Sequence, residues 1–200
     1  MSPLFSAIAI AASLTRLVLF TLLHFARSGY DPVAHAVSDY AIGKTARLSC
    51  AMSWVAVITW LSLAGAVWSG LPDWDYCPTA VILLLVLAVI FVILPFVPTD
   101  LEGEQRTRRG LLHYALAIAW FAVAYSLTGD LSRFGTRHWS DWMGATLTGL
   151  HLVAMASLIA LVIALVVGPL RRYFGLAERV FLTAISLFYL FAAVGILMFA

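Results

Sequence analysis

Two short polar segments of this chain carry the residue types that could do chemistry. The first holds Ser38 and Asp39, with His35 shortly before them, and the second holds Asp100 and, further along, His113. Two carboxylates and an imidazole brought together could coordinate a divalent metal. With a serine hydroxyl they could instead serve as a general acid and base. We take Ser38, Asp39, Asp100 and His113 as candidate catalytic residues. The alternative, a structural polar network that pins the two segments, stays open.

Arg16 is the one formal charge within an otherwise apolar stretch that covers residues 1–26. It lies roughly 18 Å along a helix from the start of the chain. A charge near the centre of a bilayer costs about 2.5–3.5 kcal/mol on insertion scales. We therefore expect a buried partner for Arg16, with Asp39, Asp100 or a backbone carbonyl as candidates. An anionic substrate is the functional alternative, so Arg16 and His35 are candidate substrate-binding residues.

His151 is the third candidate substrate-binding residue. It lies in a charge-free stretch and shares one face of a helix with Gly144 and Thr148, because these positions are three and four residues apart. Small residues on this face would let a neighbouring helix approach closely. A histidine satisfied within the packing is the simpler interpretation. A proton-relay or ligand role for His151 is the alternative.

The elements that must position these residues are transmembrane helices. Five stretches contain no Lys, Arg, Asp or Glu: 48–72, 76–99, 110–129, 142–170 and 180–200. Each approaches or exceeds the roughly 20 helical residues that cross a hydrocarbon core. Together with the apolar stretch over residues 1–26, they predict an all-α integral membrane bundle of about six helices, forming a single domain over residues 1–200. The predicted helices cover 4–25, 46–68, 79–97, 110–127, 143–167 and 180–199.

The composition supports a membrane-embedded protein in contact with the lipid bilayer. Hydrophobic residues make up 63% of the chain and charged residues 11%, whereas soluble domains carry about 25% charge. The net charge is only +2 and the arginines are scattered, which argues against a nucleic-acid partner. Long unbroken apolar runs also argue against a β-barrel, whose strands alternate.

The basic residues predict how the helices are oriented. With six helices, the first, third and fifth connectors lie on one side and hold nine Lys and Arg residues, against two in the second and fourth. This positive-inside asymmetry predicts that the nine are cytoplasmic, that both termini lie outside, and that the protein resides in the cell inner membrane. The nine are Arg27, Lys44, Arg47, Arg106, Arg108, Arg109, Arg171, Arg172 and Arg179.

The same topology places the two polar segments at the cytoplasmic face. Pro95 and Pro98 end the third helix because proline cannot donate to the helical ladder, so Asp100 follows at the membrane rim. The first connector is long and largely apolar, and we expect it to fold back against the bundle. Asp39, Asp100 and His113 are therefore expected at one depth.

Both polar segments resemble motifs of a known family. The stretch His-x-x-Ser-Asp-Tyr-x-x-Gly covers 35–43, and Phe-x-Pro-Thr-Asp-x-x-Gly covers 96–103, followed by Gly-x-x-His at 110–113. These motifs are similar to those of the bacterial and archaeal domain-of-unknown-function family 998, which consists of small membrane proteins of about six helices. The resemblance implies that Ser38, Asp39, Asp100 and His113 are characteristic polar positions of the family. It implies no activity, because none is established for the family.

Three functional interpretations follow from these residues. An enzyme acting on a lipid or lipid-linked substrate would need the Asp, His and Ser groups to converge. A small-molecule or proton-coupled transporter would need a polar path that continues through Arg16, Thr148 and His151. A b-type haem protein would need two facing histidines, such as His24 and His113. The sequence names no cofactor and no protein partner.

An internal similarity suggests a further possibility for the architecture. His35, Ser38 and Asp39 precede one helix, and a similar His-x-Ser-Asp stretch at 138–141 precedes another. This spacing is compatible with an inverted repeat of three plus three helices, as in many transporters. Helix-capping preferences alone would produce much of the similarity.

Overall fold

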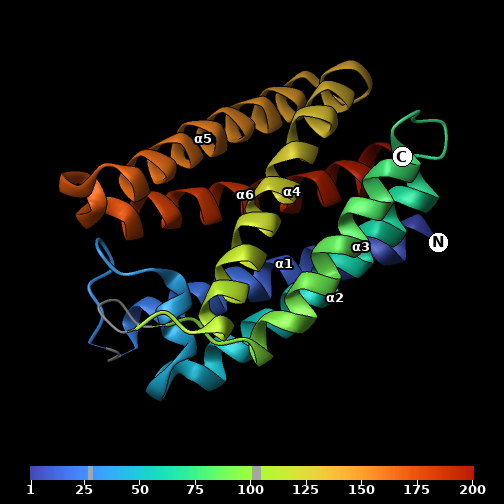
Figure 1. The fold of residues 1–200 in the computed structure, drawn as a ribbon. Helices are drawn as coiled ribbons and strands as arrows, with labels where there is room; N and C mark the ends of the chain where they lie inside the picture. Colours follow the sequence, from blue (N-terminus) through green and yellow to red (C-terminus); the bar gives the residue numbers. More distant parts are fainter. Residues whose placement is uncertain (27–28, 101–104) are drawn as a thin grey trace.

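Six long helices run through the described part of the chain, residues 1–26, 29–100 and 105–200 of a computed structural model (Figure 1). All six are long and apolar enough to span a membrane, as the sequence predicted. The prediction of an all-α membrane bundle is therefore confirmed. The helices are α1 (Ser2–Phe25), α2 (Ala46–Gly70), α3 (Cys77–Ile93), α4 (Arg108–His138), α5 (Asp141–Val166) and α6 (Phe174–Phe199).

The helices form a closed ring in chain order. Each helix packs against the next one along the chain, and α6 packs against α1. The contact between α3 and α4 is the least extensive of these. Figure 1 shows α4 meeting α5 at one end of the bundle and separating from it toward the other end, where the first and third connectors lie. The bundle is therefore tighter at one end than at the other.

Two helices extend beyond their predicted limits, toward opposite ends of the bundle. The sequence predicted that the fourth helix ends at residue 127, but α4 continues to His138. At 31 residues it is about 46 Å long, so its charged last turns can leave the hydrocarbon without ending the helix. The sixth helix was predicted from residue 180 but starts at Phe174. Glu178 and Arg179 consequently lie inside α6 and not in a connector.

The first connector folds against the bundle, as its apolar composition predicted. It contains two short 3-10 helices, η1 (Val37–Ala41) and η2 (Gly43–Thr45). Gly43 has a φ of 71°, a conformation that residues with a Cβ rarely adopt. The similar stretch at 138–141 instead spans the end of α4 and the start of α5, so the two stretches do not share a local conformation. Arg27 of this connector and Gly103 of the second motif lie outside the described residues.

A layer of aromatic side chains crosses the middle of the ring. Trp60 of α2 lies 6.3 Å from Phe91 of α3, which lies 5.3 Å from Trp120 of α4. Phe121 continues the layer to Phe181 of α6 at 4.9 Å. All five rings are buried. They contribute large apolar contact area at the centre of the bundle.

Candidate functional site

A cavity of about 220 Å³ lies at the end of the bundle where the first and third connectors meet the helices. All six helices and the first connector contribute to its wall. Three rings of the aromatic layer, those of Phe91, Trp120 and Phe121, also line it. Most of the wall is apolar. The charged, histidine and serine residues that line it are Arg16, Ser38, Ser49, Ser53, His113 and Glu178.

This cavity brings together some of the residues that the sequence singled out and not others. Ser38 and His113 both line it, and so does Arg16. Asp39 and Asp100 do not belong to its wall. The two candidate carboxylates therefore lie behind the cavity, in the segments that carry Ser38 and lead to His113.

Arg16 is buried and its guanidinium is only partly satisfied. One terminal nitrogen, NH1, donates to Ser186 Oγ of α6 at 2.7 Å, and the guanidinium carbon lies 5.5 Å from the centre of the Phe91 ring. Its Nε is buried and makes no hydrogen bond within the described residues. The sequence predicted a buried partner for Arg16, and one is present, but it is the Ser186 hydroxyl and not one of the candidates named, Asp39, Asp100 or a backbone carbonyl.

His113 is held in one orientation by the end of the third helix. Its Nδ1 donates to the carbonyl oxygen of Val97 at 2.7 Å. That carbonyl is available because α3 ends at Ile93 and the following turn, Leu94–Phe96, stops before Pro98. With the proton on Nδ1, neutral His113 keeps the lone pair of Nε2 for another donor.

Asp100 completes the N-terminus of α4. Its carboxylate accepts hydrogen bonds from Thr107 N at 2.7 Å and Thr107 Oγ1 at 2.8 Å, and Thr107 Oγ1 accepts from Gly110 N at 3.0 Å. A Cβ on Gly110 would clash with the Asp100 carboxylate, so a larger residue there would force that side chain to move. Asp100 thus joins the third connector to the first turn of α4, and His113 follows on that helix about one turn later.

The first connector is attached to α6 through two residues that the sequence interpretation had left in a connector. Glu178 is buried, and its Oε2 accepts from the backbone N–H of Val37 at 2.7 Å. Asp39, also buried, lies within electrostatic range of Glu178. Ser38 therefore directly follows a residue whose backbone N–H is held by α6.

Arg179 makes the second attachment. Its NH1 donates to the carbonyl oxygens of His35 at 2.7 Å and Gly175 at 3.0 Å. Its Nε donates to His24 Nε2 at 2.7 Å, and its NH2 to the Tyr40 hydroxyl at 3.3 Å. One side chain thereby joins α1, the first connector and α6.

A sequence signal existed for Glu178. Glu178, Leu182, Ile185 and Tyr189 are spaced by three or four residues and all are buried. The apolar face of the sixth helix therefore continues through Glu178. A charge in register with such a face is expected to be buried against a partner and not solvated.

The haem and metal interpretations find no support in this geometry. His24 uses both ring nitrogens, because Nδ1 donates to Phe20 O at 2.7 Å while Nε2 accepts from Arg179. It therefore has no lone pair left for iron. Within residues 1–26, 29–100 and 105–200, no three His, Cys, Asp or Glu side chains gather as metal ligands would.

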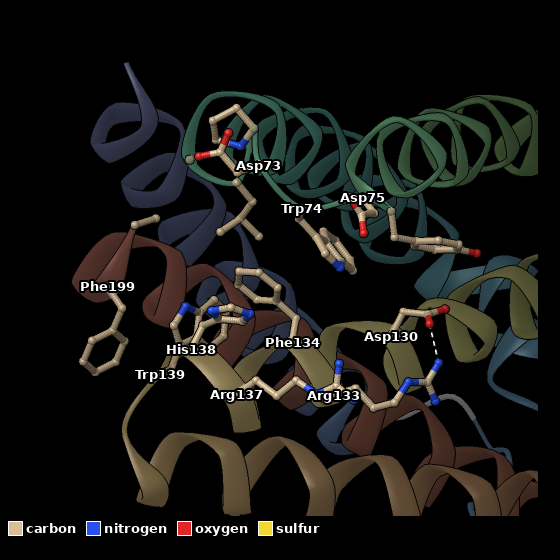
Figure 2. Close-up of a pocket in the computed structure, with 15 residues that line it drawn as sticks. Asp73, Trp74, Asp75, Asp130, Arg133, Phe134, Arg137, His138, Trp139 and Phe199 are labelled. Carbon is tan, nitrogen blue, oxygen red and sulfur yellow. Dashed lines mark hydrogen bonds and ion pairs between the residues drawn. The ribbon is translucent and has the colours of Figure 1, made fainter.

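A second cavity, of about 630 Å³, lies at the opposite end of the bundle (Figure 2). The connector between α2 and α3 forms one side of it, and the last turns of α4 form the other. Both aromatic and charged side chains line it. The two cavities share no lining residue.

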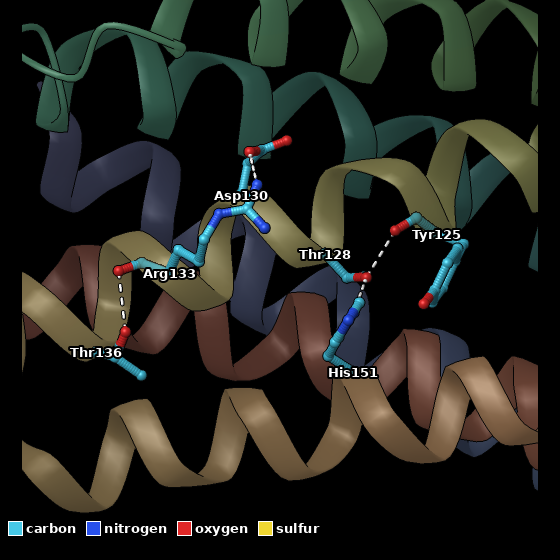
Figure 3. A network of polar contacts seen from close by, with 6 residues as sticks. All are labelled: Tyr125, Thr128, Asp130, Arg133, Thr136 and His151. Carbon is cyan, nitrogen blue, oxygen red and sulfur yellow. Dashed lines mark hydrogen bonds and ion pairs between the residues drawn. The ribbon is translucent and has the colours of Figure 1, made fainter.

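His151 lies between α4 and α5 and belongs to neither cavity (Figure 3). Thr128 Oγ1 donates to the carbonyl oxygen of Tyr125 at 2.6 Å, which makes His151 Nδ1 the donor to Thr128 Oγ1 at 2.8 Å. The imidazole also stacks on the Tyr125 ring, with centroids 5.2 Å apart. Thr148, on the same face, pairs with Ser132 at 3.0 Å. The predicted helix face therefore packs on α4.

A comparison with known protein families matches a region that includes both polar motifs. The model of the family described as protein of unknown function, DUF998, matches residues 10–195. The chain belongs to the DUF998 family. The resemblance drawn from the two polar motifs is thereby confirmed, and it covers nearly all of the bundle. No curated protein and no solved structure matches the chain.

Proposed function

We propose that this multi-pass membrane protein binds an anionic lipid or lipid-linked substrate in the cavity between the first connector, α3 and α4, and acts on its head group. The observation that carries the proposal is Arg16. A buried guanidinium with an unpartnered Nε, on the wall of an apolar cavity, is costly unless an anion completes it. A phosphate group in the cavity would accept from a terminal nitrogen of this guanidinium, and Nε would take part only if the side chain turned toward the cavity.

The rest of the cavity fits the remainder of such a ligand. Its wall is largely apolar and suits an acyl or polyprenyl chain. Tyr114 and Ile118 of α4 line it and are 43% and 64% exposed, so the wall reaches the surface that faces lipid. In this proposal a lipid enters sideways from the bilayer past Tyr114 and Ile118.

Ser38 and His113 supply the candidate chemistry. With Nδ1 held by Val97, His113 can accept a proton at Nε2 from a hydroxyl or a water at the bound head group. Ser38 lines the same cavity, and its hydroxyl is the candidate nucleophile. Asp100 and Asp39 act as positioning residues in this proposal, because one holds the start of α4 and the other the first connector.

We further propose that the cavity lies at the cytoplasmic face of the inner membrane. The described cations of the first, third and fifth connectors lie at this end of the bundle, and the positive-inside rule predicts that such connectors stay in the cytoplasm. The substrate would then come from the cytoplasmic leaflet. His35, which does not line the cavity, is a positioning residue in this proposal, since its backbone carbonyl accepts from Arg179.

The binding step is tested with purified protein in nanodiscs. Native mass spectrometry would measure how much phosphatidylglycerol, against phosphatidylcholine, stays bound to the protein. We expect the wild type and Arg109→Gln, a variant of an exposed arginine at the same end, to retain phosphatidylglycerol. Arg16→Met should lose the preference by about tenfold or more. Equal retention of both lipids by the wild type would contradict the proposal.

The chemical step is tested by two substitutions of one residue. His113→Asn can still donate to Val97 O but has no group at the position of Nε2, and His113→Gln places an amide near that position, which cannot take up a proton. After incubation with phosphatidylglycerol vesicles, phosphorus NMR would follow any change in the head group. We expect His113→Asn to abolish turnover with the fold intact. A head group that the wild type leaves unchanged would contradict this step, and movement of unaltered lipid between leaflets would favour the transporter alternative.

A further inference from the structure

The cavity at the opposite end of the bundle has a composition that the lipid proposal does not use. Trp74, Tyr76 and Phe134 line it as half-buried rings. Three carboxylates and two guanidinium groups line it as well, from Asp73, Asp75, Asp130, Arg133 and Arg137. Figure 2 shows Trp74 of the α2–α3 connector beside Phe134 of α4, with Asp130 further along the same helix.

The aromatic rings form a continuous wall. The Trp74 ring lies 5.7 Å from Tyr76 and 5.3 Å from Phe134, and Phe134 is stacked on His138 at 4.5 Å. Because these contacts hold each half-buried ring in place, the apolar surface that the rings present to the cavity is pre-organised. Two other tryptophans near this end, Trp68 and Trp142, are 63% and 52% exposed and do not line the cavity. They fit the interfacial aromatic belt of membrane proteins.

The charges are mixed in sign and partly paired. Arg133 forms an ion pair with Asp130 one turn away on α4 (Figure 3). Arg137 also lies in the last turn of α4, where a cation interacts favourably with the helix dipole. A simple anion would be repelled by the three carboxylates, and a simple cation by the two arginines. A neutral ligand with many hydroxyl groups can accept from the guanidinium groups and donate to the carboxylates at the same time.

From this combination we infer a saccharide-binding site at the face opposite the proposed lipid site. A pyranose ring presents a flat patch of C–H groups and a rim of hydroxyls. The first matches the Trp74 and Phe134 faces, and the second matches the Asp130–Arg133 pair. The cavity of about 630 Å³ is large enough for a short oligosaccharide, since ligand pockets of about 300–1,000 Å³ enclose drug-sized molecules. The charge asymmetry predicts that this face lies outside the cell membrane.

The test measures saccharide binding to the full chain in nanodiscs by saturation-transfer NMR. The probes are trisaccharides of glucose, galactose, mannose and N-acetylglucosamine. We expect at least one to bind the wild type, and Trp74→Leu to weaken its binding about tenfold or more. Trp142→Leu is the matched control and should bind as the wild type does. Arg133→Gln, at a side chain that is 66% exposed, should weaken binding without altering thermal unfolding.

The outcomes separate this site from the lipid site. Absence of binding by all four probes overturns the inference, and so does equal binding by Trp74→Leu and the wild type. Preferential binding of a zwitterion such as glutamine, tested in the same format, also overturns it. Trp74→Leu should retain phosphatidylglycerol as the wild type does, because Trp74 does not line the lipid cavity. The saccharide-binding result can therefore stand even if the lipid proposal fails.

Discussion

Arg179 of α6 donates from Nε to Nε2 of His24 on α1, at 2.7 Å, across a sequence separation of 155 residues. The same guanidinium reaches the backbone of the first connector at His35. One buried side chain therefore closes the ring of helices between α6 and α1 and holds the connector that carries Ser38.

Replacing Arg179 should destabilise the protein more than replacing any exposed arginine at the same end. Arg179→Gln removes the hydrogen bonds to His24 and to the carbonyl oxygen of His35, and each buried acceptor left without its donor costs about 1–3 kcal/mol. Thermal unfolding in detergent would measure the loss. Arg172→Gln, at an exposed position, is the control and should change the unfolding temperature little. Equal effects of the two variants would show that Arg179 does not hold the connector.

Arg16→Met should have the opposite effect on stability. The guanidinium is buried and its Nε is unpartnered within the described residues, so an apolar chain of similar length removes a desolvation cost. We expect the unfolding temperature to rise or stay constant while the preference for phosphatidylglycerol is lost. A marked fall in unfolding temperature would indicate that Arg16 is a structural residue.

The contact between Asp100 and Gly110 can be tested by a double-mutant cycle. Gly110→Ala places a Cβ against the Asp100 carboxylate, so the Asp100 side chain must shift and its hydrogen bonds to Thr107 are strained. Asp100→Ala alone removes two hydrogen bonds to Thr107 and costs about 1–3 kcal/mol. The double variant should be less destabilised than the sum of the two single variants, because the clash is then absent. Additive effects would contradict the close approach.

His151 should contribute to stability modestly and to lipid binding not at all. His151→Leu removes the hydrogen bond to Thr128 between α4 and α5, and such bonds within membranes contribute about 0.6 kcal/mol on average. Thermal unfolding and phosphatidylglycerol retention would be measured on the same sample. Thr146→Ala is the control, because the Thr146 hydroxyl donates only within its own helix, to the carbonyl oxygen of Trp142. A loss of lipid binding in His151→Leu would connect the α4–α5 interface to the first cavity.

The orientation in the membrane can be tested by single-cysteine labelling. In a variant that lacks Cys50 and Cys77, cysteines introduced at Lys44 and Arg172 should react only with reagents that enter the cytoplasm. Cysteines introduced at Asp73 and Arg137 should react from outside. The reverse pattern would contradict the positive-inside prediction and would exchange the sides of the two cavities.

Much of the fold follows from local properties of the sequence. The uninterrupted apolar stretches predicted the six helices, because backbone groups in hydrocarbon must be satisfied within each segment. The prolines at 95 and 98 predicted the end of α3, and the apolar first connector predicted its packing against the bundle. The end of α4 was missed because a helix that emerges from the membrane into the interface can carry charges such as Asp130 and Arg133. Composition alone does not distinguish such a helical segment from a connector.

The order of the helices along the chain was enough to assign Ser38, Asp39, Asp100 and His113 to one end of the bundle, since alternating helices fix the end at which each connector falls. Which of these residues share a cavity depended on the three-dimensional packing. The pairing of Arg16 with Ser186 and of Glu178 with Val37 depends on which helix faces meet around the ring. The packing of all six helices together decides which faces meet. The paired residues are 170 and 141 positions apart in the chain, so no local sequence pattern predicts that they pair.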